Sequence, residues 1–367
     1  MNVTADQVRA FRLRRQHVAL RDGTDPTAIA RRLVGVQAQV PSAAAQAVAV
    51  RTADGTAHDG AVEAALAAGA LIRTWSLRGT LHLLAADQAP AVLALLAAAR
   101  TWDKGSWQRE FATAAQMAAL EAAVAEVLAD AVLTREELVA ALVAHSREES
   151  LADALGSGWG AVLKPLAWQG LLCHGPPAGS RVTFAHPRTL VPGWPGLPDP
   201  DEAAREVVPA FLAAHGPATA TAFDAWLLRG ATPKKRLRAW FADLVADGSL
   251  VEVSVDGEAR YSRAEDVDEL GAAGPGLRLL GPFDPYVLGA GTADPDLVPT
   301  AHRGEVSRAA GWIAPVVLDG GRVVGTWRAE DDRLEVTPFG TPLPDGALGD
   351  ERAVWSRILG RPLTLQG

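Results

Sequence analysis

Two glutamines stand two residues apart in the segment from Val34 to Ser42, which reads VGVQAQVPS. A carboxamide does not ionise and is a weak nucleophile, so Gln37 and Gln39 are unsuited to acid, base or nucleophilic roles. Carboxamides can instead hold a water molecule and point a dipole at a developing charge. They can also simply satisfy loose backbone groups between two helices. The residue types alone leave both interpretations open.

The flanking residues predict how the two amides are oriented. Residues i and i+2 point in nearly opposite directions on a helix, but they share one face of an extended chain. Gly35 is a stop signal for the preceding helix, and Pro41 disfavours a helical conformation at Val40. We therefore expect an extended segment in which both amides reach the same place.

The familiar enzyme signatures are missing from the sequence. It contains no GxxxxGK[ST], GxSxG or HExxH motif and no credible GxGxxG motif. The eight histidines show no metal-binding spacing, and Cys173 is the single cysteine, so we expect no metal, no cofactor and no internal disulfide. No secretion signal is visible, and the apolar run at 90–99 is too short to span a bilayer. These features predict a soluble, cytoplasmic protein with no membrane partner.

Charge is unevenly distributed along the 367 residues, although the net charge is −8. Residues 1–50 hold seven arginines and three acidic residues, and residues 229–240 hold five basic residues and no acidic one. Residues 241–270 hold nine acidic residues and two arginines. The net charge disfavours generic nucleic-acid binding, whereas the segregation leaves room for one basic face.

The elements that must position the glutamines follow a repeating plan of helices and then a glycine-turned hairpin. We expect hairpins around Arg78-Gly79, within 174–187 and around Asp256-Gly257. Helices followed by a hairpin are the layout of a winged helix. The fold class is thus expected to be α+β, with winged-helix modules at 1–112, 113–195 and 196–268 and a small β-rich domain at 269–367. Linkers are expected near 190–200 and 264–276. Thr4, Asp25 and Thr134 are the expected N-caps of helices.

Four motifs together carry a family resemblance: VGVQAQVPSAAAQAVAVR, LIRTWSLRGTLHLL, PFDPYVLG and GRVVGTW. With this order along essentially the whole chain, the sequence resembles the AlkZ-like family of bacterial winged-helix DNA glycosylases. The family signature is two glutamines around one apolar residue, which Gln37-Ala38-Gln39 matches. A sister branch has aspartate at the second position, and Gln39 places this chain in the glutamine branch.

The resemblance implies an activity and an architecture. It implies a monofunctional enzyme that excises N7-alkylated purines and unhooks interstrand crosslinks, with Gln37 and Gln39 as its catalytic residues. It also implies three winged helices curved around a channel for double-stranded DNA, and a C-terminal hairpin that probes the duplex. The hairpin Val316 to Trp327 is the match by position, with Arg322 at its tip. We expect a monomer associated with the nucleoid.

Further basic residues are candidate DNA contacts, each with a plainer alternative. Lys234, Lys235, Arg236 and Arg238 follow Thr232-Pro233 at a helix start, where winged helices present phosphate-binding residues. Arg12, Arg78 and His82 are weaker candidates. His82 alternates with two leucines and is equally interpretable as a structural histidine, while Arg322 and the helical cluster are equally interpretable as solvated charges.

Two functions from other classes compete with the glycosylase hypothesis. The first is a non-catalytic winged-helix transcription regulator, which would need a dimerisation helix or a compact basic recognition helix. No heptad segment is visible, and the basic residues are spread over several modules. The second is an interaction scaffold whose winged helices dock proteins, which is compatible with the net charge.

Overall fold

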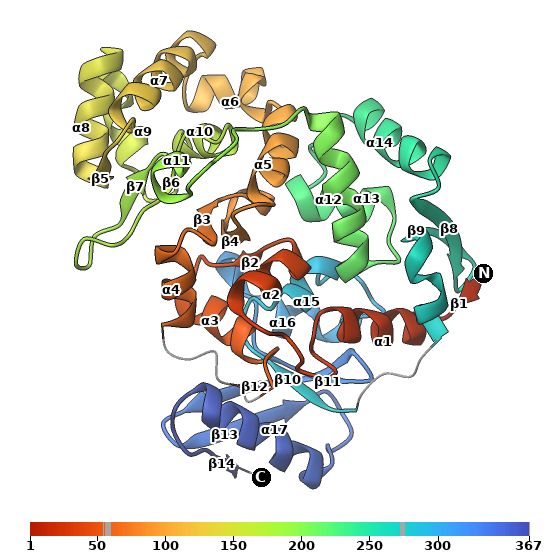
Figure 1. The fold of residues 1–367 in the computed structure, drawn as a ribbon. Helices are drawn as coiled ribbons and strands as arrows, with labels where there is room; N and C mark the ends of the chain where they lie inside the picture. The colour runs from red at the N-terminus through yellow and green to blue at the C-terminus, as the bar shows by residue number, and fades with distance from the viewer. Residues whose placement is uncertain (54, 56–59, 272–275, 367) are drawn as a thin grey trace.

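The computed structural model of the chain describes residues 1–53, 55, 60–271 and 276–366. It is a mixed fold of helices and three sheets (Figure 1). The first region contains β1 (Asn2–Val3), α1 (Ala5–Arg15), α2 (Pro26–Leu33), β2 (Val36–Gln37), α3 (Pro41–Ala49), α4 (Ala61–Ala67), β3 (Leu71–Trp75), η1 (Leu77–Gly79), β4 (Leu81–Ala85), α5 (Ala89–Ala98) and α6 (Gly105–Glu110).

Two further regions repeat the plan of helices followed by a hairpin. The second contains α7 (Ala114–Val127), β5 (Val132–Thr134), α8 (Arg135–Ser146), α9 (Ala152–Gly156), α10 (Leu163–Trp168), β6 (Cys173–His174), β7 (Thr183–Ala185) and α11 (Pro187–Leu190). The third contains α12 (Pro200–His215), α13 (Ala220–Leu228), α14 (Lys234–Ala246), β8 (Leu250–Val255) and β9 (Glu258–Arg263). All three predicted hairpins are present.

The helix starts are fixed by the expected caps. Thr4 and Thr134 form capping boxes at α1 and α8, in which each side chain accepts a bond from the third helical residue. The Asp25 side chain accepts from Ala28 N at 2.9 Å at the start of α2. The predicted N-caps are confirmed.

The first two hairpins are joined in one sheet instead of belonging to separate modules. Its strand order is β2-β4-β3-β6-β7-β5, and the pair Arg73 and His174 connects the hairpins. The expected boundary at 112/113 therefore does not separate two independent cores. Residues 1–15 also lie elsewhere than predicted, because β1 pairs with β8 and Phe11 packs against Val253 of the third region.

The C-terminal region holds β10 (Arg278–Leu280), α15 (Pro285–Ala290), α16 (Arg303–Val306), β11 (Val316–Asp319), β12 (Arg322–Glu330), β13 (Arg333–Pro338), α17 (Asp345–Ile358) and β14 (Thr364–Gln366). Its five strands form one sheet in sequence order. The strands expected within residues 269–367 are present as this sheet, but α17 was not expected. This helix buries Leu348, Val354 and Trp355 on one side, which is the pattern of a helix that covers a sheet.

The expected DNA-probing hairpin is part of this core. Val316, Val317, Leu318 and Val323 in β11 and β12 are fully buried. The turn is fastened as well, because the Tyr286 hydroxyl donates to the Gly321 carbonyl at 2.8 Å. The hairpin Val316 to Trp327 is thus built into the C-terminal sheet, and its role in probing DNA stays a prediction.

One of the two predicted linkers is confirmed. No helix or strand covers residues 191–199, between α11 and α12. The second expected linker instead begins as a 3-10 helix at Ala264–Gly271, and its residues 272–275 lie outside the described part of the chain. Within the described ranges, no helix is long and apolar enough to cross a membrane. The apolar run at 90–99 forms most of α5, which is buried from Ala89 to Leu96.

Candidate active site at the paired glutamines

The segment that carries the glutamines is extended at Gln37, as predicted, and then bends at Gln39 and Val40. Gln37 ends β2, and it is the direct antiparallel partner of His82 in β4. Gln37 is 8% exposed, whereas Gln39 is exposed at the surface. The two amides therefore share a segment but differ in environment.

Gly35 makes this path possible. The helix α2 ends at Leu33, Val34 is left-handed, and Gly35 has φ of +120°, which side chains rarely allow. A Cβ atom at Gly35 would also lie 2.9 Å from Leu84 Cδ2. Pro41 then begins α3, so the extended segment is held between two helix ends.

Both carboxamide oxygens interact with the β3–β4 turn. Gln37 Oε1 accepts from Arg78 Nη2 and from Thr80 Oγ1, both at 3.4 Å. Gln39 Oε1 accepts from the Leu81 amide at 3.3 Å. The two amides thus meet neighbouring residues of one turn.

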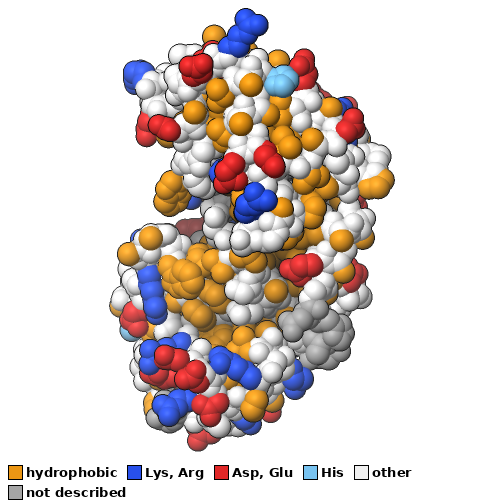
Figure 2. All heavy atoms as spheres, turned by 90° about the vertical axis from the view of Figure 1, so that its left-hand side faces the viewer, with side chains coloured by type: hydrophobic (Ala, Val, Ile, Leu, Met, Phe, Trp, Pro, Cys, Tyr) orange, Lys and Arg blue, Asp and Glu red, His pale blue; other side chains and the backbone are white. Residues whose placement is uncertain are grey.

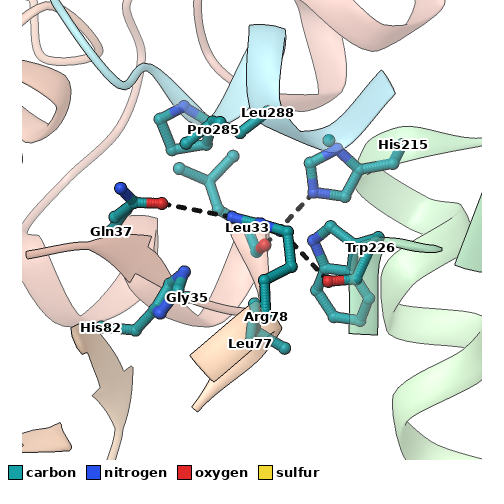
Figure 3. Close-up of a pocket in the computed structure, with 11 residues that line it drawn as sticks. Leu33, Gly35, Gln37, Leu77, Arg78, His82, His215, Trp226, Pro285 and Leu288 are labelled. Atoms are coloured by element: carbon teal, nitrogen blue, oxygen red, sulfur yellow. Dashed lines mark hydrogen bonds between the residues drawn. The ribbon is translucent and has the colours of Figure 1, made fainter. Parts of the chain in front are cut away.

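A small, partly open cavity lies beside Gln37, lined by parts of the chain that are distant in sequence (Figure 3). Its lining consists of Leu33, Gly35, Gln37, Leu77, Arg78, His82, His215, Trp226, Pro285, Leu288 and Gly289. The space open to the centre of a water-sized sphere is about 10 Å³. That is room for one water molecule and far too little for a purine base.

Arg78 stands in the middle of this lining. It has φ of +56° in the tight turn, a strained conformation that turns its side chain toward the cavity. Its guanidinium also donates to the Trp226 carbonyl in α13 at 3.1 Å. Burial, and then the charge of Arg229, lower the Arg78 pKa to about 10, so the group stays protonated at neutral pH.

Two histidines in the cavity are neutral. Burial, followed by the charge of Arg78, lowers the pKa of His82 to about 3. Burial likewise lowers the pKa of His215 to about 3. Both imidazoles are therefore uncharged at physiological pH and act as neutral hydrogen-bonding groups.

A fully buried ion pair joins two walls of the cavity. Arg51, just after α3, binds Asp284 through two bonds of 2.9 and 2.7 Å, and both side chains are 0% exposed. Asp284 also caps α15 by accepting from the Tyr286 amide at 2.8 Å. The pair thus fixes α15, which supplies Pro285, Leu288 and Gly289 to the cavity, to the region that carries Gln37.

Two weaker candidates for DNA contact are buried. Arg12 is 8% exposed, and its guanidinium donates to the carbonyls of Gly216 and Pro217 at 3.3 and 3.0 Å. It ties α1 to the third region, so the expected DNA contact is wrong for Arg12 in this conformation. His82 is 1% exposed and cannot reach a phosphate at the surface, which favours the alternative of an internal histidine.

The remaining basic candidates are at the surface. We call Lys234, Lys235, Arg236 and Arg238 the basic turn. Lys234 lies 3.2 Å from Asp224, and Arg236 lies 3.6 Å from Asp201, so these two charges are already paired. Lys235 and Arg238 are exposed and have no ion pair within the described residues, and Arg322 is exposed beside the β11–β12 turn.

One face of the molecule carries mixed charges, and one tryptophan is largely exposed, neither of which was predicted from the sequence. Figure 2 shows basic and acidic side chains mixed over the face on the left of Figure 1, with hydrophobic side chains between them. Trp159 is 81% exposed, whereas most other tryptophans are buried or half-buried. Among the described residues, no cluster of histidine, cysteine and carboxylate side chains could hold a metal ion.

Sequence reasoning missed His215 and Trp226, which line the cavity from distant parts of the chain, and the buried pair Arg51 and Asp284, which fixes α15 in place. The motif VGVQAQVPSAAAQAVAVR ends at Arg51. The motif PFDPYVLG contains Asp284 and Pro285. It contributed to the resemblance without an assigned role. In the structure, the motif PFDPYVLG forms one wall of the cavity.

Known proteins resemble this chain over nearly its whole length. A family model described as DNA glycosylase AlkZ-like matches residues 30–356. The chain is 45% identical over 366 residues to the interstrand DNA cross-link repair glycosylase of Streptomyces sahachiroi, with 98% of each chain covered. The solved structure of Streptomyces sahachiroi DNA glycosylase AlkZ matches with a TM-score of 0.95 and 44% identity over 100% of both chains. This chain therefore belongs to the AlkZ-like family of DNA glycosylases and is an enzyme that acts on DNA.

Proposed function

We propose that this enzyme excises cationic N7-alkylated purines from double-stranded DNA and unhooks interstrand crosslinks attached at N7. The observation that carries the proposal is the one-water cavity beside Gln37, next to the exposed amide of Gln39. The relative from Streptomyces sahachiroi bears the name of a cross-link repair glycosylase, which supports the choice of lesion.

The chemistry of the lesion suits a site with amides in place of carboxylates. An N7-alkylguanine carries a positive charge, so its glycosidic bond is already weakened and the base leaves neutral. Protonation of the leaving group would gain little. What remains is to place a water near C1′ and to stabilise an oxocarbenium-like sugar, which oriented dipoles can do.

The two glutamines have different roles in this reaction because Gln37 is buried and Gln39 is exposed. Gln37 lines the cavity and holds the water, whereas the exposed Gln39 points its carboxamide dipole at the sugar. The bonds of 3.3 and 3.4 Å to the β3–β4 turn orient both amides before DNA arrives. Preorganised dipoles of this kind need no rearrangement during the reaction.

A crosslinked base explains why a small cavity is an advantage. An enzyme that flips a base into a deep pocket cannot flip one that is tethered to the opposite strand. A cavity of about 10 Å³ takes no base, so the lesion stays outside and only the water is enclosed. The site is then open on the DNA side.

DNA binding is proposed to involve the basic turn, Arg322 and the exposed Trp159, with the three helical regions curved around the duplex. The enzyme acts as a monomer at the nucleoid. The alternatives of a transcription regulator or a protein scaffold have no support in the family to which the chain belongs.

The test is incubation with duplex DNA that contains one N7-methylguanine, followed by heating in mild alkali. Strand breaks at the lesion are expected, because an abasic site is labile to alkali. Borohydride should trap no covalent complex, since no lysine lines the cavity. Binding without any break would overturn the proposal.

A further inference from the structure

The polar groups around the cavity determine the orientation of a water molecule bound in it. This inference rests on the proposed function. Gln37 Oε1 already accepts from Arg78 and Thr80. A guanidinium and an indole only donate hydrogen bonds, so Arg78 and Trp226 cannot accept one through their side chains. The water needs an acceptor if its lone pair is to face the sugar.

His215 is already occupied on both ring nitrogens. Its Nε2 lies 3.3 Å from the Leu33 carbonyl, which can only accept, so Nε2 carries the proton. Its Nδ1 lies 3.2 Å from Gln16 Nε2, which donates to it. His215 therefore shapes the cavity without offering it an acceptor.

His82 has one nitrogen to spare. Its Nδ1 lies 3.1 Å from the Thr80 carbonyl, so Nδ1 carries the proton and Nε2 keeps a lone pair. No hydrogen bond from a described residue occupies that lone pair. Burial and the charge of Arg78 hold the pKa of His82 near 3, which keeps Nε2 unprotonated.

The sheet places the His82 side chain on the same face as Gln37, and both residues line the cavity. His82 and Gln37 are direct cross-strand partners, so their side chains project from the same face at adjacent positions. Figure 3 shows the His82 ring below Gln37, on the opposite side of the cavity from His215 and Trp226. At 1% exposure, His82 faces this lining and not bulk solvent.

We propose that His82 Nε2 accepts a hydrogen bond from the cavity water and thereby aims the water's lone pair at C1′, which makes His82 a positioning residue for the nucleophile. The C1′–O bond forms as the C1′–N9 bond breaks. The electron pair of the broken bond neutralises the cationic base, and the water's proton leaves to solvent.

Three substitutions separate this role from a structural one. His82→Gln places an amide oxygen near the Nε2 position but loses the bond to Thr80. His82→Asn keeps a donor for Thr80 but has no atom at Nε2, and His82→Phe has neither. The measurement is the single-turnover rate of N7-methylguanine release, together with DNA affinity and melting temperature.

We expect His82→Gln to keep most of the rate, whereas His82→Asn and His82→Phe lose about tenfold, the effect of one hydrogen bond. DNA affinity should be unchanged in all three. Full rate in His82→Asn with a loss in His82→Gln would overturn the inference, because it assigns His82 only the Thr80 bond. No release by the wild type would overturn the proposed function as well.

A measurement on the wild-type protein covers the case in which the variants do not fold. Nitrogen-15 NMR of the histidine rings, with the His82 ring assigned by through-bond correlation from its own backbone signals in the wild-type protein, reports the tautomer directly. We expect an unprotonated Nε2 from pH 8 to pH 5. A proton on Nε2 in that range would overturn the inference.

Discussion

The cavity beside Gln37 and the basic turn at the start of α14 are built in opposite ways. The cavity draws its lining from all along the chain, from Leu33 to Gly289, and fastens it with buried bonds. The residues of the basic turn lie within four positions of one another in sequence, at the start of the single helix α14, and their ion pairs with other helices are those to Asp224 and Asp201. The proposed catalytic site therefore depends on long-range packing, whereas the proposed DNA-binding charge depends on local sequence.

This difference predicts that the largest effect comes from breaking the ion pair behind the cavity. Asp284→Asn leaves the Arg51 guanidinium buried without a counter-charge, which should cost about 3–5 kcal/mol of unfolding free energy. Urea denaturation measures this loss. The control is Asp87→Asn, whose partner Arg31 is 47% exposed, and which should change stability by at most about 1 kcal/mol. Equal losses would contradict the difference between buried and exposed pairs.

Removing the Gln37 amide should have the next largest effect. Gln37→Ala is expected to lower the single-turnover rate of N7-methylguanine release by about 10²–10³-fold, as for other preorganised dipoles. DNA affinity should stay the same, because Gln37 is buried. Gln108→Ala on α6 is the matched control and should keep the wild-type rate. A Gln37→Ala enzyme with normal rate and weak binding would place Gln37 in the DNA interface instead.

Lowering the pH should lower the free energy of unfolding through the buried histidines before it changes the basic turn. The pKa values of His82, His174 and His215 are each lowered to about 3 by burial, so these rings are neutral when folded. The unfolded chain takes up their protons below pH 6.5, so stability is lost as pH falls from 6.5 toward 3. Each histidine contributes about 1.4 kcal/mol per pH unit in that window. Urea midpoints at pH 7.5, 6 and 5 test this, and a flat profile would contradict it.

The smallest effects should come from the basic turn. Lys235→Ala with Arg238→Ala should weaken DNA binding, and the slope of log affinity against log salt should become shallower by about 1 for each phosphate that the variant no longer neutralises. The rate at saturating enzyme should not change. The reference variants are Lys234→Ala and Arg236→Ala, whose charges are paired with Asp224 and Asp201 and should matter less. A decrease in rate at saturation would link this surface to the chemistry.

Local signals predicted the local structure well. Gly35 and Pro41 were sufficient to predict the extended segment, and the glycine turns were sufficient to predict the hairpins. The cross-strand pairing of Gln37 with His82 was not predictable, because strand register depends on the whole sheet. The burial of Arg12 was missed because its partners are the carbonyls of Gly216 and Pro217, which leave no signal in side-chain types.

The most direct test of a site that encloses one water and no base uses a crosslinked duplex. Wild-type enzyme is incubated in parallel with a duplex that carries N7-methylguanine and with one joined by an N7–N7 crosslink. Both lesions should be released, and Gln37→Ala should lose both activities together. Release of methylguanine with an intact crosslink would contradict the open site, because it would show that the enzyme must take the base into a pocket.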